Sequence, residues 1–155
     1  PCGYLGDPGG RCRCTAEQVA RYRGRISGPL LDRIDMHIEV PRVEVQRLAQ
    51  ATSSQTETSA QVRHRVCAAR ARQEARAGRC NSALTPREVE RDCVLDAAGQ
   101  SLLEQALTRL SLSARAYHRI LKLARTIADL AAEERISPAH LGEAIGYRRL
   151  DRGVP

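Results

Sequence analysis

The sequence of residues 112–130 is LSARAYHRILKLARTIADL, and this stretch decides the fold class. Apolar side chains recur in it every three or four positions, which is the period of an α-helix with one apolar face. Ser113 stands directly before the pattern and is a residue type that caps helix N-termini. We therefore expect one helix here that buries its apolar face against other helices. The residues that keep the period are Leu112, Ala116, Ile120, Leu123, Ala124, Ile127 and Leu130.

The surrounding sequence repeats these helix signals. Further helices are indicated over residues 59–77, after Thr85-Pro86, over residues 102–110 and after Ser137-Pro138. Thr85 and Ser137 are N-cap residue types, and a proline in the first turn costs no hydrogen bond. Leu141 and Ile145 are expected to face inward in the last helix. Several helices joined by short loops are typical of a bundle, which we expect over residues 59–155.

The first third of the chain has a different pattern. Residues 1–14 form a glycine-rich loop, and Thr15 with Gln18 has the spacing of a capping box, so a short helix should end near Gly24. Residues 30–34, LLDRI, follow a proline and predict a turn or two of helix. Residues 36–40 alternate around His37 and predict a short strand of a parallel sheet or its edge. A short helix should cover residues 43–50, and the polar residues 51–58 read as a linker, so residues 1–50 predict a fragment of a mixed α/β unit.

Composition limits the class of protein. Of 155 residues, 42% are hydrophobic and 28% charged, which is typical of a globular chain. No apolar run reaches the roughly 18 residues that a membrane span needs, and no secretion signal follows Pro1, so we expect a cytoplasmic piece of a longer protein with reduced thiols. The net charge is +7, and every basic side chain except Lys122 is Arg. This bias favours nucleotide, nucleic-acid or acidic partners, although a GC-rich genome would produce the same bias.

Four separated strings carry a specific resemblance. They are CGYLGD at 2–7, RCRCT at 11–15, QVARYRGRISGPLLDRID at 18–35 and the helix at 112–130. In this order they resemble the C-terminal half of magnesium-chelatase-like AAA+ ATPases, in particular the ComM type. The resemblance implies a mainly α chain, in which the end of an α/β AAA+ core precedes a helical-bundle lid. It also implies ATP and Mg²⁺ as cofactors. The sequence contains no G-x-x-x-x-G-K-[ST] string and no apolar run that ends in paired acids, so we expect this chain alone to be inactive.

The resemblance gives Arg33 a role. In related ATPases, the Arg of an L-L-[DS]-R-[FI] string reaches into the neighbouring subunit's nucleotide site, and Arg33 matches it. A guanidinium stays charged at any working pH, so it can stabilise the charge that builds up on the γ-phosphate. Leu30, Leu31 and Ile34 would anchor the turn, and the flanking acids, Asp32 and Asp35, would orient Arg33. The alternative is a plain ion pair of Arg33 with these two acids.

Arg115 is the second candidate. It lies in the first turn after Ser113, where backbone N–H groups and the helix dipole favour an anion. Related ATPases use an Arg at the start of a lid helix, the sensor-2 arginine, to contact the γ-phosphate, and Arg115 matches that position. The alternative is that Arg115, Arg119 and Lys122 form one solvated helix face.

Cysteine gives the third candidate site. Cys2, Cys12 and Cys14 lie in the glycine-rich loop, and their thiolates could surround one Zn²⁺. Three ligands are one fewer than a closed structural site needs. Similar proteins carry a further Cys two positions before Cys2, and His37 or water could take its place. The alternative is a set of reduced loop thiols.

Arginines crowd the helix predicted over residues 59–77 and its exit. These charges could form phosphate contacts with DNA, which need charge more than geometry, whereas base stacking is not expected without aromatic residues. A solvated face is the alternative. The candidate DNA contacts are Arg63, Arg70, Arg72 and Arg76.

The resemblance implies that the whole protein is a ring-forming, hexameric ATPase that drives DNA remodelling, such as branch migration in transformation and recombination. Its expected partners are neighbouring subunits and DNA, and no membrane. One alternative is the ATPase subunit of a magnesium chelatase. The other is a stand-alone helical module that binds DNA or protein.

Overall fold

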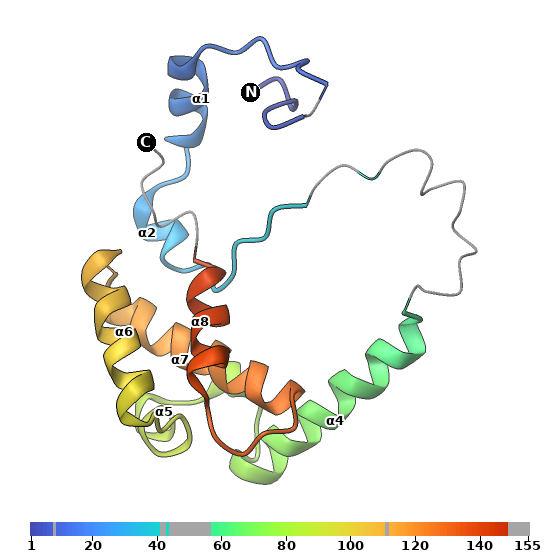
Figure 1. The fold of residues 1–155 in the computed structure, drawn as a ribbon, viewed down its shortest axis with the longest axis vertical. Coiled ribbons are helices and arrows are strands. Elements are labelled where there is room, and N and C mark those ends of the chain that lie inside the picture. The colour runs from blue at the N-terminus through green and yellow to red at the C-terminus, as the bar shows by residue number, and fades with distance from the viewer. Residues whose placement is uncertain (8, 41–42, 44–56, 111, 149–155) are drawn as a thin grey trace.

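The computed structural model describes residues 1–7, 9–40, 43, 57–110 and 112–148, and the described part is mainly helical (Figure 1). The first two helices are α1 (Ala16–Arg23) and α2 (Gly28–Leu31). The bundle consists of α4 (Ser59–Ala77), the 3₁₀ turn η1 (Asn81–Ala83), α5 (Pro86–Asp92), α6 (Ala97–Arg109), α7 (Ala114–Leu130) and α8 (Pro138–Gly146).

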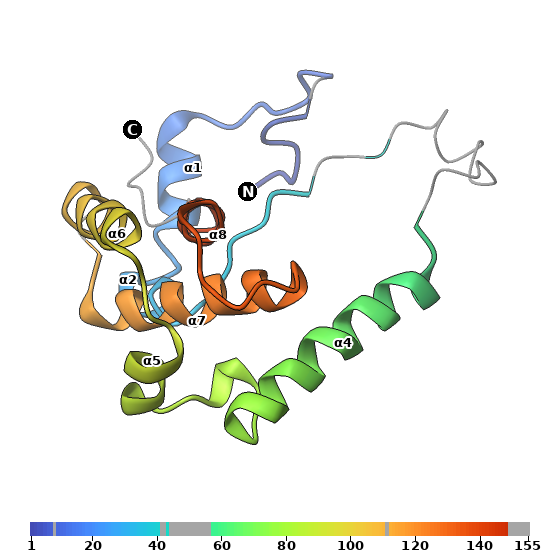
Figure 2. The same ribbon diagram turned by 60° about the horizontal axis from the view of Figure 1, so that its bottom comes forward.

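Helix α7 is the centre of the bundle. It contacts α4, η1, α5 and α8, and α6 packs on α8. Figure 2 shows α8 lying across α7, with α4 extending to one side. The side chains of Leu103, Ile120 and Leu141 are fully buried between these helices. The periodicity of residues 112–130 therefore identified the core helix, except that Leu130 at its end is 39% exposed.

Local capping explains where the helices begin. Thr15 and Thr85 accept hydrogen bonds from backbone N–H groups of Gln18 and Glu88, and both form complete capping boxes. Ser113 and Ser137 cap α7 and α8 by accepting hydrogen bonds from the backbone N–H groups of Ala116 and His140. Helix α4 ends at Gly78, whose φ of 66° is the left-handed conformation that glycine adopts without a steric penalty. The predicted helix starts at Thr85, Ser113 and Ser137 are confirmed.

A buried ionic cluster joins α4 and η1 to α7. Asp129, which is 1% exposed, accepts hydrogen bonds from Arg76 at 2.8 and 2.6 Å and from Asn81 at 2.8 Å. Arg125 lies 3.2 Å from the same carboxylate. Burial opposes ionisation of Asp129, but the hydrogen bonds from Arg76 and Asn81 outweigh it, so the pKa of Asp129 lies below its usual value.

The strand predicted over residues 36–40 is wrong. The segment has no regular structure, and the described residues contain no strand. Alternating side chains form a strand only where a neighbouring strand supplies hydrogen bonds. Here the backbone N–H of His37 instead donates to the carbonyl of Tyr147 at 2.7 Å, directly after α8. The helix predicted over 43–50 and most of the linker predicted over 51–58 lie outside the described residues.

No helix among the described residues is both long enough and apolar enough to cross a membrane.

Candidate functional site

The turn after α2 is docked onto the start of α7. Ser113, the N-cap of α7, donates from its Oγ to both carboxylate oxygens of Asp32, at 2.9 and 3.0 Å. The same Oγ accepts the N–H of Ala116. Arg115 places its Nη1 3.5 Å from Oδ2 of Asp32. The carboxylate of Asp32, in the turn after α2, is therefore hydrogen-bonded to the N-terminus of α7.

Two further arginines fix the backbone of this turn. Arg119 donates to the carbonyl of Arg33 at 2.6 Å and also bonds the carboxylate of Asp35. Arg148 is 1% exposed and donates to the carbonyl of Ile34 at 3.0 Å, while its second Nη lies 3.5 Å from Asp32. Residues 32–35 are thus held on both sides by side chains of the bundle.

The Arg33 side chain is not part of these contacts. It is exposed and forms no hydrogen bond or ion pair with any residue that the structure describes. Both flanking acids bind arginines of the bundle, so the alternative, an ion pair of Arg33 with Asp32 and Asp35, is absent from the described structure. The backbone of Arg33 is fixed and its guanidinium is free to meet an external anion.

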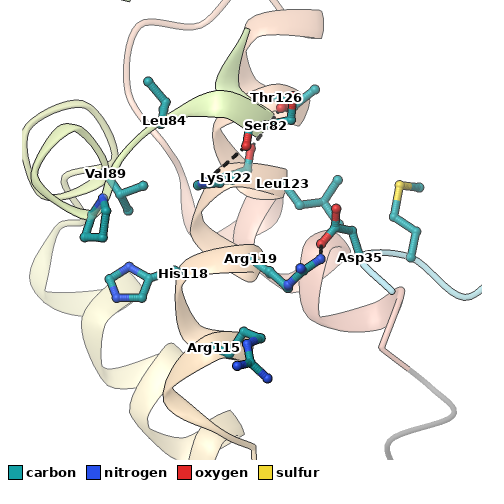
Figure 3. Close-up of a pocket in the computed structure, with 12 residues that line it drawn as sticks. Asp35, Ser82, Leu84, Val89, Arg115, His118, Arg119, Lys122, Leu123 and Thr126 are labelled. Carbon is teal, nitrogen blue, oxygen red and sulfur yellow. Dashed lines mark hydrogen bonds and ion pairs between the residues drawn. The ribbon is translucent and has the colours of Figure 1, made fainter. Parts of the chain in front are cut away.

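Arg115 lines a groove of about 440 Å³ along α7 (Figure 3). The groove carries the basic side chains Arg115, Arg119 and Lys122, the last of which donates to the carbonyl of Ser82 at 3.1 Å, and also His118 and the acid Asp35. Part of its lining is apolar. This part includes Leu84, Pro86 and Val89. Such a groove can accept a ligand that has an anionic and an apolar part, and the Arg115 side chain is 53% exposed.

The alternative of one solvated face for Arg115, Arg119 and Lys122 does not describe this helix. Arg119 and Lys122 have partners in other segments, and only Arg115 is largely exposed. Sequence reasoning missed the roles of Arg119 and Arg148. Both lie more than 80 positions from the turn that they hold, and no local pattern signals such a contact.

The three loop cysteines lie close together. The Sγ atoms of Cys2, Cys12 and Cys14 are all within 4.8 Å of one another, and those of Cys2 and Cys12 are 3.6 Å apart. A backbone hydrogen bond at Tyr4, assisted by Cys14, lowers the pKa of Cys2 to about 7. His37, which could have replaced a fourth ligand, is not part of this cluster, and its backbone N–H donates to the carbonyl of Tyr147.

The arginines of α4 divide into two groups. Arg72 donates to the carbonyl of Asp129 at 3.2 Å and Arg76 binds the buried carboxylate of the same residue, so both serve the fold. Arg70 lies near Cys80 and Glu74. Arg63 is exposed and forms no ion pair within the described residues.

The chain belongs to the magnesium chelatase subunit ChlI family. The model of the C-terminal domain, "Magnesium chelatase, subunit ChlI C-terminal", matches residues 56–148, and that of "Magnesium chelatase, subunit ChlI" matches residues 1–48. Within this family the chain is of the ComM type. It is 51% identical over 140 residues, 90% of its length, to the competence protein ComM of Haemophilus influenzae.

Two further relatives, named as uncharacterized YifB proteins, come from enteric bacteria. Identity is 46% to the protein of Salmonella typhimurium and 43% to that of Escherichia coli, each over 152 residues, or 98% of this chain. The chain spans 27% of the length of the Haemophilus protein and 29% of each YifB protein. It therefore corresponds to less than a third of these relatives.

Proposed function

We propose that this chain is the C-terminal region of a ring-forming AAA+ ATPase and that Arg33 acts on ATP bound by the neighbouring subunit. The observation that carries the proposal is the contrast at residues 32–35. Three arginines of the bundle fix the turn, whereas the Arg33 guanidinium is exposed and unpaired within the described structure. The fixed backbone sets where this cation can reach, and its unpaired guanidinium breaks no internal ion pair when it meets a phosphate.

The chemistry follows from charge. Phosphoryl transfer spreads negative charge over the γ-phosphate oxygens, and the planar guanidinium of Arg33 can donate two hydrogen bonds to them. Bound ATP and Mg²⁺ would supply the transferred group and the metal that neutralises it. A cation that comes from the next subunit makes hydrolysis depend on assembly of the ring, so neighbouring copies are the partners that this proposal requires.

Arg115 would contact the nucleotide as the sensor-2 arginine. Its present partner, Asp32, is one carboxylate at 3.5 Å that Ser113 and Arg148 also share. A triphosphate carries more charge and can attract Arg115 away from Asp32. Asp32 directly precedes Arg33 in the chain. Loss of the contact between Arg115 and Asp32 would therefore shift the backbone that carries the proposed arginine finger, Arg33. Nucleotide contact and finger position would thereby be coupled.

DNA is the proposed substrate of the motor. The chain carries a net charge of +7, and Arg63 and Arg70 lie on exposed positions of α4. Phosphate contacts of this kind are independent of base sequence, as a motor that moves along DNA requires. The Haemophilus relative is named as a competence protein, which supports a role in processing transforming DNA. We therefore propose DNA remodelling, such as branch migration, in a cytoplasmic, hexameric assembly.

A second candidate is the ATPase subunit of a magnesium chelatase. The observation in its favour is that both matching family models describe a subunit of that enzyme. In this case the ring would use the same two arginines, but hydrolysis would drive metal insertion. Its turnover would then be indifferent to DNA.

The test is the ATPase rate of the full-length protein with and without forked DNA. Wild type is compared with Arg33→Ala and with the control Arg23→Ala, which removes an exposed arginine from the last turn of α1. The proposal predicts that DNA stimulates turnover and that only Arg33→Ala reduces it, on the order of 10³-fold. Unchanged turnover in Arg33→Ala would reject the arginine finger. Turnover that needs Arg33 but ignores DNA would favour the chelatase.

A further inference from the structure

The glycine-rich loop at the start of the chain brings three cysteines to one point. Cys2 lies ten residues before Cys12, and Cys14 directly precedes Thr15, the N-cap of α1. Their Sγ atoms nevertheless all lie within 4.8 Å of one another. Figures 1 and 2 show this loop folded beside α1 and away from the helical bundle. The loop therefore needs a stabilising feature of its own.

Packing does not provide that feature. None of residues 1–7 and 9–14 is buried, so the loop has no apolar core. Its internal contacts include two turn hydrogen bonds, the ion pair of Arg11 with Asp7 at 2.8 Å and the stacking of Arg11 over Tyr4 at 4.4 Å. The Arg11 side chain is 47% exposed, and ion pairs of such exposed arginines contribute little stability. Small units without a core are usually held by a metal ion or by disulfides.

The number of thiols favours a metal ion over a disulfide. A disulfide uses two sulfurs and leaves the third without a function, whereas a metal ion uses all three. The distances agree with this choice, because a tetrahedral Zn²⁺ with Zn–S bonds of about 2.3 Å holds its sulfurs about 3.8 Å apart. Cys2 and Cys12 are 3.6 Å apart, and Cys14 lies within the same small volume. Three soft thiolates select Zn²⁺ over the hard ions Mg²⁺ and Ca²⁺.

We propose that Cys2, Cys12 and Cys14 bind one Zn²⁺ through their Sγ atoms and that this ion fixes the loop to the start of α1. Each thiol that is still protonated releases its proton to water when it binds. Among the described residues no fourth Cys, His, Asp or Glu joins the cluster, so water or an added donor completes the tetrahedron around the ion. The site is structural, because it lies apart from Arg33 and Arg115, and it does not depend on the ATPase proposal.

The test is elemental analysis of the full chain, purified under reducing conditions and washed with a weak chelator. Cys2→Ser, Cys12→Ser and Cys14→Ser are compared with Cys67→Ser, which removes an exposed thiol on α4. We expect one zinc per chain in wild type and in Cys67→Ser, and loss of zinc by at least tenfold in each of the other three. Absence of zinc from wild type, or full occupancy in any of the three loop variants, would overturn the proposal.

Two controls make these results decisive. The helical bundle shares no core with the loop, so all four variants should keep the thermal unfolding curve of wild type by circular dichroism. Replacement of zinc by Co²⁺ should give the strong thiolate-to-cobalt absorption, and each loop variant should weaken it while Cys67→Ser does not. Mass spectrometry that finds a disulfide between two of the loop cysteines in the reduced preparation would also overturn the proposal.

Discussion

The carboxylate of Asp32 lies 3.5 Å from the guanidinium of Arg115, although the two residues are 83 positions apart in the chain. This pair joins the segment that carries Arg33 to the helix at the centre of the bundle. Ser113 and Arg148 share the same carboxylate. Asp32 is therefore the point through which both proposed nucleotide-contacting arginines are linked.

Asp32→Asn should loosen this turn. The substitution keeps the shape but removes the charge that Arg115 and the buried Arg148 share, and hydrogen bonds to charged groups contribute roughly 1.5–3 kcal/mol. We expect the free energy of unfolding, measured with urea, to fall by about 1–2 kcal/mol, with faster amide exchange over residues 30–37. Asp35→Asn is the matched control and should cost less, because Asp35 is 57% exposed. If Asp32→Asn and Asp35→Asn lowered the free energy of unfolding by the same small amount, the structural role of Asp32 would be contradicted.

Arg33→Ala should separate catalysis from stability. Because its side chain has no partner among the described residues, the free energy of unfolding should change by less than about 0.5 kcal/mol, as for other surface substitutions. Arg119→Ala, which removes two contacts to the same turn, should be destabilising. Urea unfolding of the two variants measures this difference. A large loss of stability in Arg33→Ala would mean that Arg33 serves the fold.

Asp129→Asn should be the most destabilising of these substitutions at neutral pH. It leaves Arg76 and Arg125 without their buried counter-charge, which typically costs about 3–5 kcal/mol. The pKa of Asp129 is lowered in the folded state, so its charge stabilises the fold above the unfolded pKa of about 3.9, and this stability is lost as pH falls through the folded pKa. The difference in stability between wild type and Asp129→Asn should therefore shrink below about pH 4.

Unfolding curves at several pH values measure this effect. Glu17→Gln is the control, since it breaks an ion pair with Arg21 in which both side chains are more than three-quarters exposed. It should have little effect at any pH. If the difference in the free energy of unfolding between wild type and Asp129→Asn stayed constant down to acid pH, the ionic account of the buried cluster would be wrong.

Arg63 and Arg76 should affect DNA binding differently. Arg63→Ala should weaken binding of the full-length protein and reduce the slope of log K against log salt by roughly 1, with no loss of stability. Arg76→Ala should destabilise the bundle first, because Arg76 binds Asp129. Fluorescence anisotropy at several salt concentrations, combined with thermal unfolding, separates the two effects. An unchanged slope of log K against log salt in Arg63→Ala would mean that Arg63 does not contact DNA phosphates.

The helices were predictable because their signals are local. Thr85, Ser113 and Ser137 form their caps within three residues, and the period of α7 follows from its own sequence. The strand at 36–40 was predicted wrongly, since a strand depends on a neighbour that a local pattern cannot supply. The contacts of Asp32 were missed for the same reason. A sequence indicates that Arg33 and Arg115 are candidates, but not that one carboxylate links their segments.

A mixing experiment tests the action of Arg33 on the neighbouring subunit most directly. Full-length Arg33→Ala is combined with a second variant that keeps Arg33 but has a disabled phosphate-binding loop, and mixed rings are isolated through two different tags. Each variant alone should be inactive. In the mixture, the intact ATP site of an Arg33→Ala subunit meets the Arg33 of its neighbour, so the account predicts that ATPase activity returns. Mixed rings that stay as inactive as their parents would contradict it.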